Sequence, residues 1–290
     1  MSLCQMCPRG CHKERDENAL GFCRAPKEFL VSRVALHPFE EPAICGKNGS
    51  GTVFFGGCNL GCVYCQNRAI SRGQKGEIFS EKALEGAILS LVEKGACNIN
   101  FVTPTHYTLP LASFLERLKP RLAVPVVWNC GGYESIDALR ALDGLVDIYL
   151  PDFKYHSPKL AEKYSHAANY CEVASTAVTE MYRQRGRVTF DREGLMTSGV
   201  MVRHLVLPSC RKDSMDVLRT IASLVPTADI RLSLMSQYTP DFVDKETYPE
   251  LARRVTSFEY NSVLDLALSL GFEGYFQSRD SAKKDYTPEF

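Results

Sequence analysis

The sequence has little of what marks an exported, membrane-bound or strongly charged protein. Its 290 residues carry 34 basic and 34 acidic side chains, so the formal net charge is +0 and the pI is about 7.0. Without a net field to attract polyanions, a nucleic-acid partner is not expected. No run of about 18 apolar residues occurs, and the opening "MSLCQMCPRG" lacks the apolar core of a signal peptide. We therefore expect a cytoplasmic protein with no membrane span.

Cysteine, in contrast, is abundant, with 12 residues in the chain. Seven of them form two close-set groups: Cys4, Cys7, Cys11 and Cys23, then Cys58, Cys62 and Cys65. Disulfides do not require such grouping, whereas a metal ion or an iron–sulfur cluster needs several thiolates around one point. In a chain with no export signal, the grouping predicts a reducing compartment and thiols that serve as ligands.

Three zones follow one another along the chain. Residues 1–50 are rich in cysteine, proline and glycine and predict loops held by a metal, residues 51–278 predict the main domain, and residues 279–290 predict a polar tail. In the main domain, short apolar runs alternate with amphipathic stretches. We expect strands at 52–57, 98–103, 122–130, 146–154, 199–208, 229–238 and 274–277, and helices at 80–95, 109–119, 135–142, 159–170, 175–186, 213–225 and 248–271.

Strands separated by helices pair in parallel through right-handed crossovers. About six such units make either an open doubly wound sheet or a complete or partial barrel, and periodicity does not separate these. In both folds the chemistry lies at the carboxyl ends of the strands. That is where this chain has its unusual residues, including Cys58, His106, Asn129 and the run "PDFK" at 151–154.

The segment "GGCNLGCVYCQN", residues 56–67, follows the first strand of the main domain and spaces its cysteines as C-x3-C-x2-C. Thiolates bind zinc, copper(I) and iron–sulfur clusters. A structural zinc ion takes four protein ligands, so a zinc site here needs a remote His or Cys. A four-iron cluster held by three thiolates instead keeps one iron open. The spacing alone leaves both sites possible.

In this setting, with Tyr64 before the last cysteine, the motif resembles that of the radical S-adenosylmethionine enzymes. In that family three cysteines hold a [4Fe–4S] cluster and S-adenosylmethionine binds the fourth iron. An electron from the cluster cleaves the cofactor to a 5′-deoxyadenosyl radical, which abstracts a hydrogen atom from the substrate. The family fold is a complete or partial (β/α) barrel, so the resemblance implies a partial (β/α)6-type barrel of parallel strands.

The segments "NINFVTPTHYT", "VDIYLPDFKY" and "SLMSQYTP" look like the branch of pyruvate formate-lyase activating enzyme-like proteins, here with a cysteine-rich N-terminal extension. The resemblance implies S-adenosylmethionine and a [4Fe–4S] cluster as cofactors. It also implies an electron donor such as flavodoxin or ferredoxin, and a glycyl radical enzyme as the protein that is activated.

Several residues match positions that are functional in the family. Cys58, Cys62 and Cys65 match the cluster ligands, and Tyr64 matches the aromatic residue near the adenine. In relatives the second strand ends in Gly-Gly-Glu. This chain has Thr103, Pro104 and Thr105 at that place, and backbone contacts to the cofactor are expected from these three residues.

"PDFK" resembles the Asp-x-Lys of activating enzymes, in which the lysine contacts the methionine carboxylate. Asp152 and Lys154 lie two apart on a strand and so point the same way. Arg203 and His204 are neighbours on a strand, so only one of them faces the interior. Together with Asn129 they complete the expected cofactor contacts.

Two further sets of residues are candidates for the site. His106 ends a strand and is the candidate for substrate contact or proton handling, with a structural role as the alternative. Gln237 and Tyr238 end a later strand and are expected on the substrate side.

The N-terminal cysteines are spaced C-x2-C-x3-C-x11-C. Four thiols with short spacings can close a structural zinc site or hold an auxiliary iron–sulfur cluster, and free thiols are the third possibility.

Two classes of function follow. The first is a radical S-adenosylmethionine enzyme, which activates a glycyl radical enzyme or acts on a small molecule or another macromolecule. The second is a non-enzymatic zinc-binding interaction module that uses both cysteine groups structurally.

Overall fold

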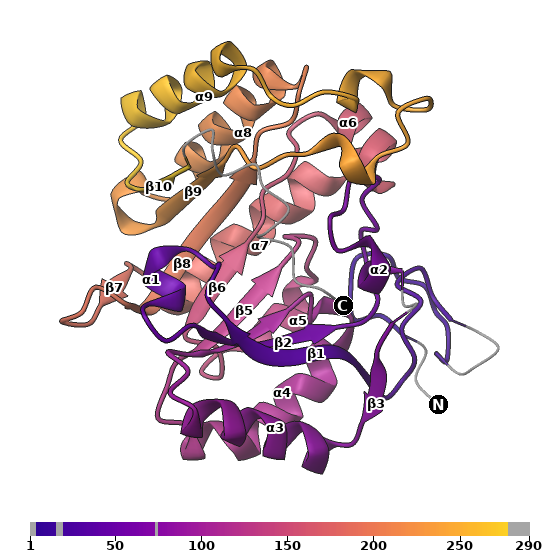
Figure 1. Ribbon diagram of the computed structural model, residues 1–290, viewed down its shortest axis with the longest axis vertical. Coiled ribbons are helices and arrows are strands. Elements are labelled where there is room, and N and C mark those ends of the chain that lie inside the picture. The colour runs from indigo at the N-terminus through magenta and orange to yellow at the C-terminus, as the bar shows by residue number, and fades with distance from the viewer. Residues whose placement is uncertain (1–3, 16–19, 73–74, 278–290) are drawn as a thin grey trace.

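A mixed ten-stranded sheet forms the centre of the computed structural model, which describes residues 4–15, 20–72 and 75–277 (Figure 1). The predicted polar tail at 279–290 lies outside these residues. The strand order is β10-β9-β8-β6-β5-β4-β2-β1-β3, and β7 pairs with β8 off this path. Seven strands pair in parallel: β2 (Ser50–Phe55), β4 (Ile99–Val102), β5 (Val126–Cys130), β6 (Ile148–Pro151), β8 (Met196–Leu205), β9 (Arg231–Met235) and β10 (Gly274–Phe276).

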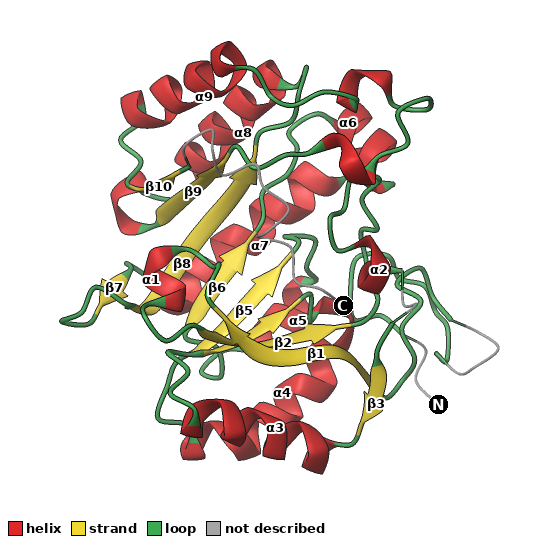
Figure 2. Cartoon of the chain, in the orientation of Figure 1, coloured by secondary structure: helices red, strands yellow, loops and turns green. Residues whose placement is uncertain are grey.

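The crossover helices lie along the outer side of the curved sheet (Figure 2). They are α3 (Glu81–Glu93), α4 (Thr108–Leu118), α5 (Ile136–Arg140), α6 (Pro158–Ser165), α7 (Tyr170–Arg185), α8 (Arg211–Leu224) and α9 (Ser257–Ser269). Within the described ranges, no helix has both the length and the apolar character needed to span a bilayer. The alternation of parallel strands and helices confirms the predicted partial-barrel α/β fold.

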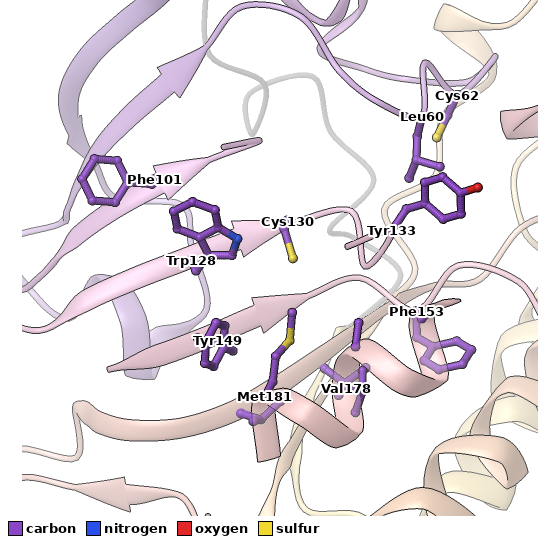
Figure 3. Packing of buried hydrophobic residues seen from close by; sticks show 14 of the residues in the cluster. Leu60, Cys62, Phe101, Trp128, Cys130, Tyr133, Tyr149, Phe153, Val178 and Met181 are labelled. Atoms are coloured by element: carbon purple, nitrogen blue, oxygen red, sulfur yellow. The ribbon is translucent and has the colours of Figure 1, made fainter. Parts of the chain in front are cut away.

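The main core lies between the sheet and these helices. Phe101, Trp128 and Tyr149 are fully buried on adjacent strands, and Val178 and Met181 of α7 belong to the same apolar cluster (Figure 3). Since successive side chains of a strand point to opposite faces, the side chains that alternate with these core residues along each strand point into the hollow of the half-barrel.

The bottom of this hollow is filled by a segment from the N-terminal zone. The short helix α1 (Pro42–Cys45) places Ala43 and Ile44 in a second buried cluster with Ile148 and Met201 of the parallel strands. The side-chain amide of Asn98 donates to the Ile44 carbonyl at 2.6 Å and holds the segment in place. Residues beyond this plug, toward the carboxyl ends of the strands, are left to line a cavity.

The prediction of loops throughout residues 1–50 is wrong for 29–37. These residues form β1 (Phe29–His37), which pairs antiparallel with both β2 and β3 (Glu77–Phe79). Residues 29–37 are held as a strand by hydrogen bonds to β2 and β3. Their sequence lacks the regular alternation of apolar and polar side chains by which a strand is recognised. The third antiparallel strand, β7 (Thr189–Phe190), is likewise short and pairs only with β8.

The predicted helix at 248–271 is also too long. Helix α9 begins at Ser257, after Thr256 and Glu259 form a capping box, and residues Pro249–Leu251 form only a separate 3-10 turn. The apolar spacing continues across this boundary, but the cap satisfies the first free N–H groups of α9 and so fixes its start.

Candidate functional site

A cavity of about 230 Å³ lies at the carboxyl ends of the parallel strands. The structure brings nine of the predicted site residues together in its lining: Cys58, Cys62, Tyr64, Cys65, Thr103, Asn129, Asp152, Lys154 and Arg203. Gln237 and Tyr238 line the same cavity from the region after β9. Residues far apart in the sequence therefore meet because each one ends or follows a parallel strand.

The three cysteines of the first loop follow β2 and come close together on one part of this cavity. Gly57 allows the turn, since its φ of +87° is a left-handed conformation, and an added Cβ would lie 2.6 Å from the Cys23 carbonyl oxygen. The short helix α2 (Arg68–Ser71) ends the loop, and the Gly57 N–H donates to the Ile70 carbonyl at 2.8 Å.

Each of the three sulfurs accepts a hydrogen bond. The Leu60 N–H donates to Cys58 Sγ at 3.4 Å, and the Ser165 hydroxyl donates to Cys62 Sγ at 3.0 Å. Cys65 accepts from the backbone of Asn67. Burial raises the pKa of the Cys58 thiol to about 12, so deprotonation here depends on a metal that replaces the proton.

This donor set fits a [4Fe–4S] cluster that is held by three thiolates. All twelve cysteines are free thiols, and the three of the Cys58 loop line one cavity, to which Cys130 also contributes and which has room for a further ligand. Among the residues that the structure describes, no group of three or more His, Cys, Asp or Glu side chains is arranged, as it stands, to hold a single metal ion.

A network of buried charges lies at the ends of β6 and β8 in the same cavity. Asp152 accepts from Lys154 Nζ at 2.6 Å and from Arg203 Nε at 3.1 Å, and Arg203 also donates to the Asn129 side-chain oxygen at 2.6 Å. Burial works to raise the pKa of Asp152, but the two cations outweigh it, and the pKa is lowered. Burial likewise opposes the charge of Lys154, yet Asp152 raises the pKa of that ammonium. All three groups are therefore charged at neutral pH.

Glu40 also lines the cavity, and the sequence analysis missed it. It lies between β1 and α1, within 3.6 Å of an Arg203 nitrogen, and accepts from the Asn100 amide at 3.2 Å and the Asn129 amide at 3.4 Å. Burial raises the pKa of this carboxyl to about 7 in spite of the nearby arginine. No local motif marks Glu40, because only the return of the N-terminal segment into the half-barrel places it here.

Four predicted site residues lie elsewhere among the described residues. Pro104, Thr105, His106 and His204 do not line the cavity. Of the neighbours Arg203 and His204, it is Arg203 that faces inward, while the ring of His204 bonds the Phe153 carbonyl at 2.7 Å behind the strand. Any contact of these four residues with a cofactor stays a prediction.

Thr105 and His106 are part of the support behind the cavity. The Thr105 hydroxyl donates to the Glu134 carboxylate at 2.6 Å, and burial raises the pKa of Glu134 to about 7. The His106 ring nitrogen Nε2 donates to the Gly56 carbonyl at 2.8 Å, directly before the cysteine loop. His106 therefore holds the strand end from which the loop begins.

The N-terminal cysteines lie at a separate place. Cys4, Cys7, Cys11 and Cys23 line a small cavity of about 10 Å³ to which His106 also contributes. The two cysteine groups are neighbours, because the Cys58 N–H donates to the Cys23 carbonyl at 3.2 Å.

Comparison with known proteins supports a cluster at this site. Residues 46–162 match the family model of a 4Fe-4S single cluster domain, and this range contains all three cysteines of the Cys58 loop. An uncharacterized protein of Methanocaldococcus jannaschii, MJ0674, is 30% identical over 282 residues, which is 91% of this chain and 74% of that protein. The chain belongs to the family of this archaeal protein.

Solved structures share the fold of the chain. Streptococcus suis SuiB bound to the precursor peptide SuiA is similar with a TM-score of 0.52 and 10% identity over 76% of this chain and 46% of that one. Methylornithine synthase (PylB) is similar with a TM-score of 0.50 and 14% identity over 73% of this chain and 59% of that one.

The radical S-adenosylmethionine methyltransferase TsrM of Kitasatospora setae has a TM-score of 0.46 and 12% identity over 64% of this chain and 36% of that one. The chain thus spans between 36% and 59% of the length of these three proteins. The family model thus supports a [4Fe–4S] site in the chain, and the two structures with TM-scores of 0.50 and 0.52 show that its fold is shared.

Replacement of Gly57 by alanine should disturb the cysteine loop. The Cβ would meet the Cys23 carbonyl, and the left-handed backbone would cost about 1–2 kcal/mol, so we expect a lower free energy of unfolding and less bound iron. The matched control is Gly86→Ala in α3, where a Cβ meets nothing within 4 Å and alanine should stabilise the helix by about 1 kcal/mol. Urea unfolding and iron analysis measure both effects. A Gly57→Ala protein as stable as the Gly86→Ala protein would contradict the assigned role of Gly57.

The buried carboxyl of Glu134 should make stability depend on pH. Because the pKa of Glu134 is raised to about 7, the folded state keeps a proton that the unfolded state has already lost. The free energy of unfolding therefore falls as the pH rises to about 7. Glu134→Gln should therefore match the parent chain near pH 4 and become more stable than it near pH 8. Urea unfolding at both pH values tests this, with the exposed Glu81→Gln as the control. An equal difference at the two pH values would rule out the assigned titration.

Proposed function

We propose that this chain is a radical S-adenosylmethionine enzyme that cleaves the cofactor reductively at a [4Fe–4S] cluster held by Cys58, Cys62 and Cys65. One observation carries the proposal: a single cavity joins the three thiols of the Cys58 loop to the buried cations Lys154 and Arg203. Soft sulfur ligands and a fixed positive charge within one cavity suit a cofactor that meets a metal and also presents a carboxylate.

When bound, the cluster supplies the electron that cleaves S-adenosylmethionine to methionine and a 5′-deoxyadenosyl radical. The chain contributes binding and orientation. Lys154 offers an ammonium to the methionine carboxylate, and Asp152 holds Lys154 and Arg203 in place through two charge-assisted hydrogen bonds. Asn129, bonded to Arg203, faces the same space and is the proposed polar contact for the ribose or methionine end.

The remaining walls keep water away from the reacting groups. Phe54, Leu60, Ile70 and Val102 line the cavity with apolar side chains. The Tyr64 hydroxyl is paired with that of Tyr155 at 2.6 Å, so the ring of Tyr64, at the cavity, is fixed in a position suited to the adenine. These side chains would limit the access of water to a bound cofactor and its substrate.

Loss of one cysteine should abolish this activity. After anaerobic reconstitution and reduction with dithionite, the parent chain is expected to bind iron and sulfide and to form 5′-deoxyadenosine. Cys62→Ala should lower that rate by about 100-fold or more, because the cluster loses a ligand. The matched control is Cys97→Ala, which removes a partly buried thiol outside the cavity and should keep the rate. Full cleavage by Cys62→Ala, or a parent chain that stays free of iron, would refute the proposal.

The finer proposal concerns the substrate, which we assign to a glycyl radical enzyme in a reducing cytoplasm, with flavodoxin or ferredoxin as the electron donor. It is supported by the resemblance of "VDIYLPDFKY" and the other quoted segments to activating enzyme-like proteins. A small molecule or another macromolecule is the alternative substrate. Incubation with a purified pyruvate formate-lyase and S-adenosylmethionine should produce a glycyl radical signal in electron paramagnetic resonance. Formation of 5′-deoxyadenosine without that signal would favour the alternative.

A further inference from the structure

The N-terminal cysteines are held in the way that metal-binding thiols are. Two short loops, 4–11 and 21–25, bring Cys4, Cys7, Cys11 and Cys23 around one small cavity. Three of these sulfurs accept backbone hydrogen bonds: Cys7 from Arg9, Cys23 from Ala25, and Cys11 from Phe22 at 3.4 Å. N–H donors directed at sulfur favour the thiolate over the thiol.

A buried cation beside this cavity has no acidic partner in the part of the chain that the structure describes. Arg15 lines the cavity and is 3% exposed, yet its guanidinium donates only to the Ala25, Pro26 and His106 carbonyls and to a methionine sulfur. Arg9 lines the cavity as well and bonds only backbone carbonyls, including that of Asn59 at 2.8 Å. An unpaired buried charge is costly, so Arg15 indicates that a negative charge occupies this place when the site is complete, and the half-buried Arg9 adds a second cation beside it.

A third observation comes from His106, which is 1% exposed and lines the same cavity. Its Nε2 donates to the Gly56 carbonyl, so Nδ1 carries the free lone pair, and Nδ1 is buried without a partner. A histidine that bonds a backbone carbonyl through one nitrogen and keeps the other free is arranged as histidines near metals are. The cavity is thus lined by four cysteines and by a histidine that has one buried ring nitrogen without a partner.

We propose that Cys4, Cys7, Cys11 and Cys23 bind one zinc ion as four thiolates, beside the free nitrogen of His106. Four thiolates and one divalent cation leave two negative charges, which Arg9 and Arg15 balance. The narrow cavity, about 10 Å³, suits one ion rather than a polynuclear cluster. Since the described cysteines are not yet arranged as a metal site, binding also requires rotation of the thiols toward the cavity.

Zinc binding would also stabilise the loop that holds Cys58, Cys62 and Cys65. The Cys23 carbonyl accepts from the Cys58 N–H at 3.2 Å, and Arg9 Nε donates to the Asn59 carbonyl in the same loop. Zinc would fix Cys23 and the turn that carries Arg9, and thereby support the backbone from which Cys58 is presented. This second site goes beyond the proposed function and does not depend on it, because zinc is expected whether or not S-adenosylmethionine is cleaved.

Metal content of the full chain tests the proposal. A variant with Cys58→Ala, Cys62→Ala and Cys65→Ala removes the first site and should retain about one zinc per chain, with zinc–sulfur distances of about 2.3 Å by X-ray absorption. Adding Cys7→Ser and Cys23→Ser should lower zinc to a background level. The matched control adds Cys97→Ser and Cys171→Ser instead, two thiols outside this cavity, and should keep the zinc. His106→Gln should also keep it.

Each outcome of these metal analyses supports or contradicts the zinc site. No zinc in the first variant, or iron and sulfide in its place, would overturn the zinc site, and loss of zinc in His106→Gln would overturn the assignment of four thiolates. If the Cys7→Ser, Cys23→Ser protein does not fold, zinc competition with a chromophoric chelator on the parent chain still decides whether one tight site exists. Because no arm measures S-adenosylmethionine cleavage, failure of the radical function and failure of the zinc site give different results.

Discussion

The strict alternation of side chains along parallel strands is the constraint on which the site depends. Trp128 and Tyr149 turn to the helices and build the core, so Asn129 and Asp152 must turn to the hollow side. Parallel pairing then brings the carboxyl ends of successive strands to one edge, where the polar residues collect. A shift of one residue in any strand would exchange core and cavity residues.

Polar groups in the hollow remain charged only because they are paired there. Asp152 lies between Lys154 and Arg203, and Glu40 approaches Arg203 from the N-terminal segment. These four groups carry two positive and two negative charges, which sum to zero when Glu40 is ionised. A zwitterionic ligand can bind in this hollow by replacing one ion-pair partner with its own charged group. No additional net charge is then buried.

The N-terminal segment completes the barrel in three ways. Strand β1 pairs with β2 at one end of the run of parallel strands, α1 fills the bottom of the hollow, and the N-terminal cysteine loops contact the Cys58 loop. Gly57 has no room for a side chain because the Cys23 carbonyl lies where a Cβ would be. The two cysteine groups are thus built as one packed unit, although each has its own cavity.

The sequence by itself determined the order of the parallel strands and their helices, the three-thiol loop and the common direction of Asp152 and Lys154, because these follow from local periodicity and short spacings. Which of Arg203 and His204 faces inward depended on the register of β8 against its neighbours, a long-range property. The start of α9 depended on a cap that interrupts a continuing apolar pattern. Only the tertiary structure placed Glu40 in the cavity and His106 beside the N-terminal cysteines, because both positions arise from contacts between segments far apart in the chain.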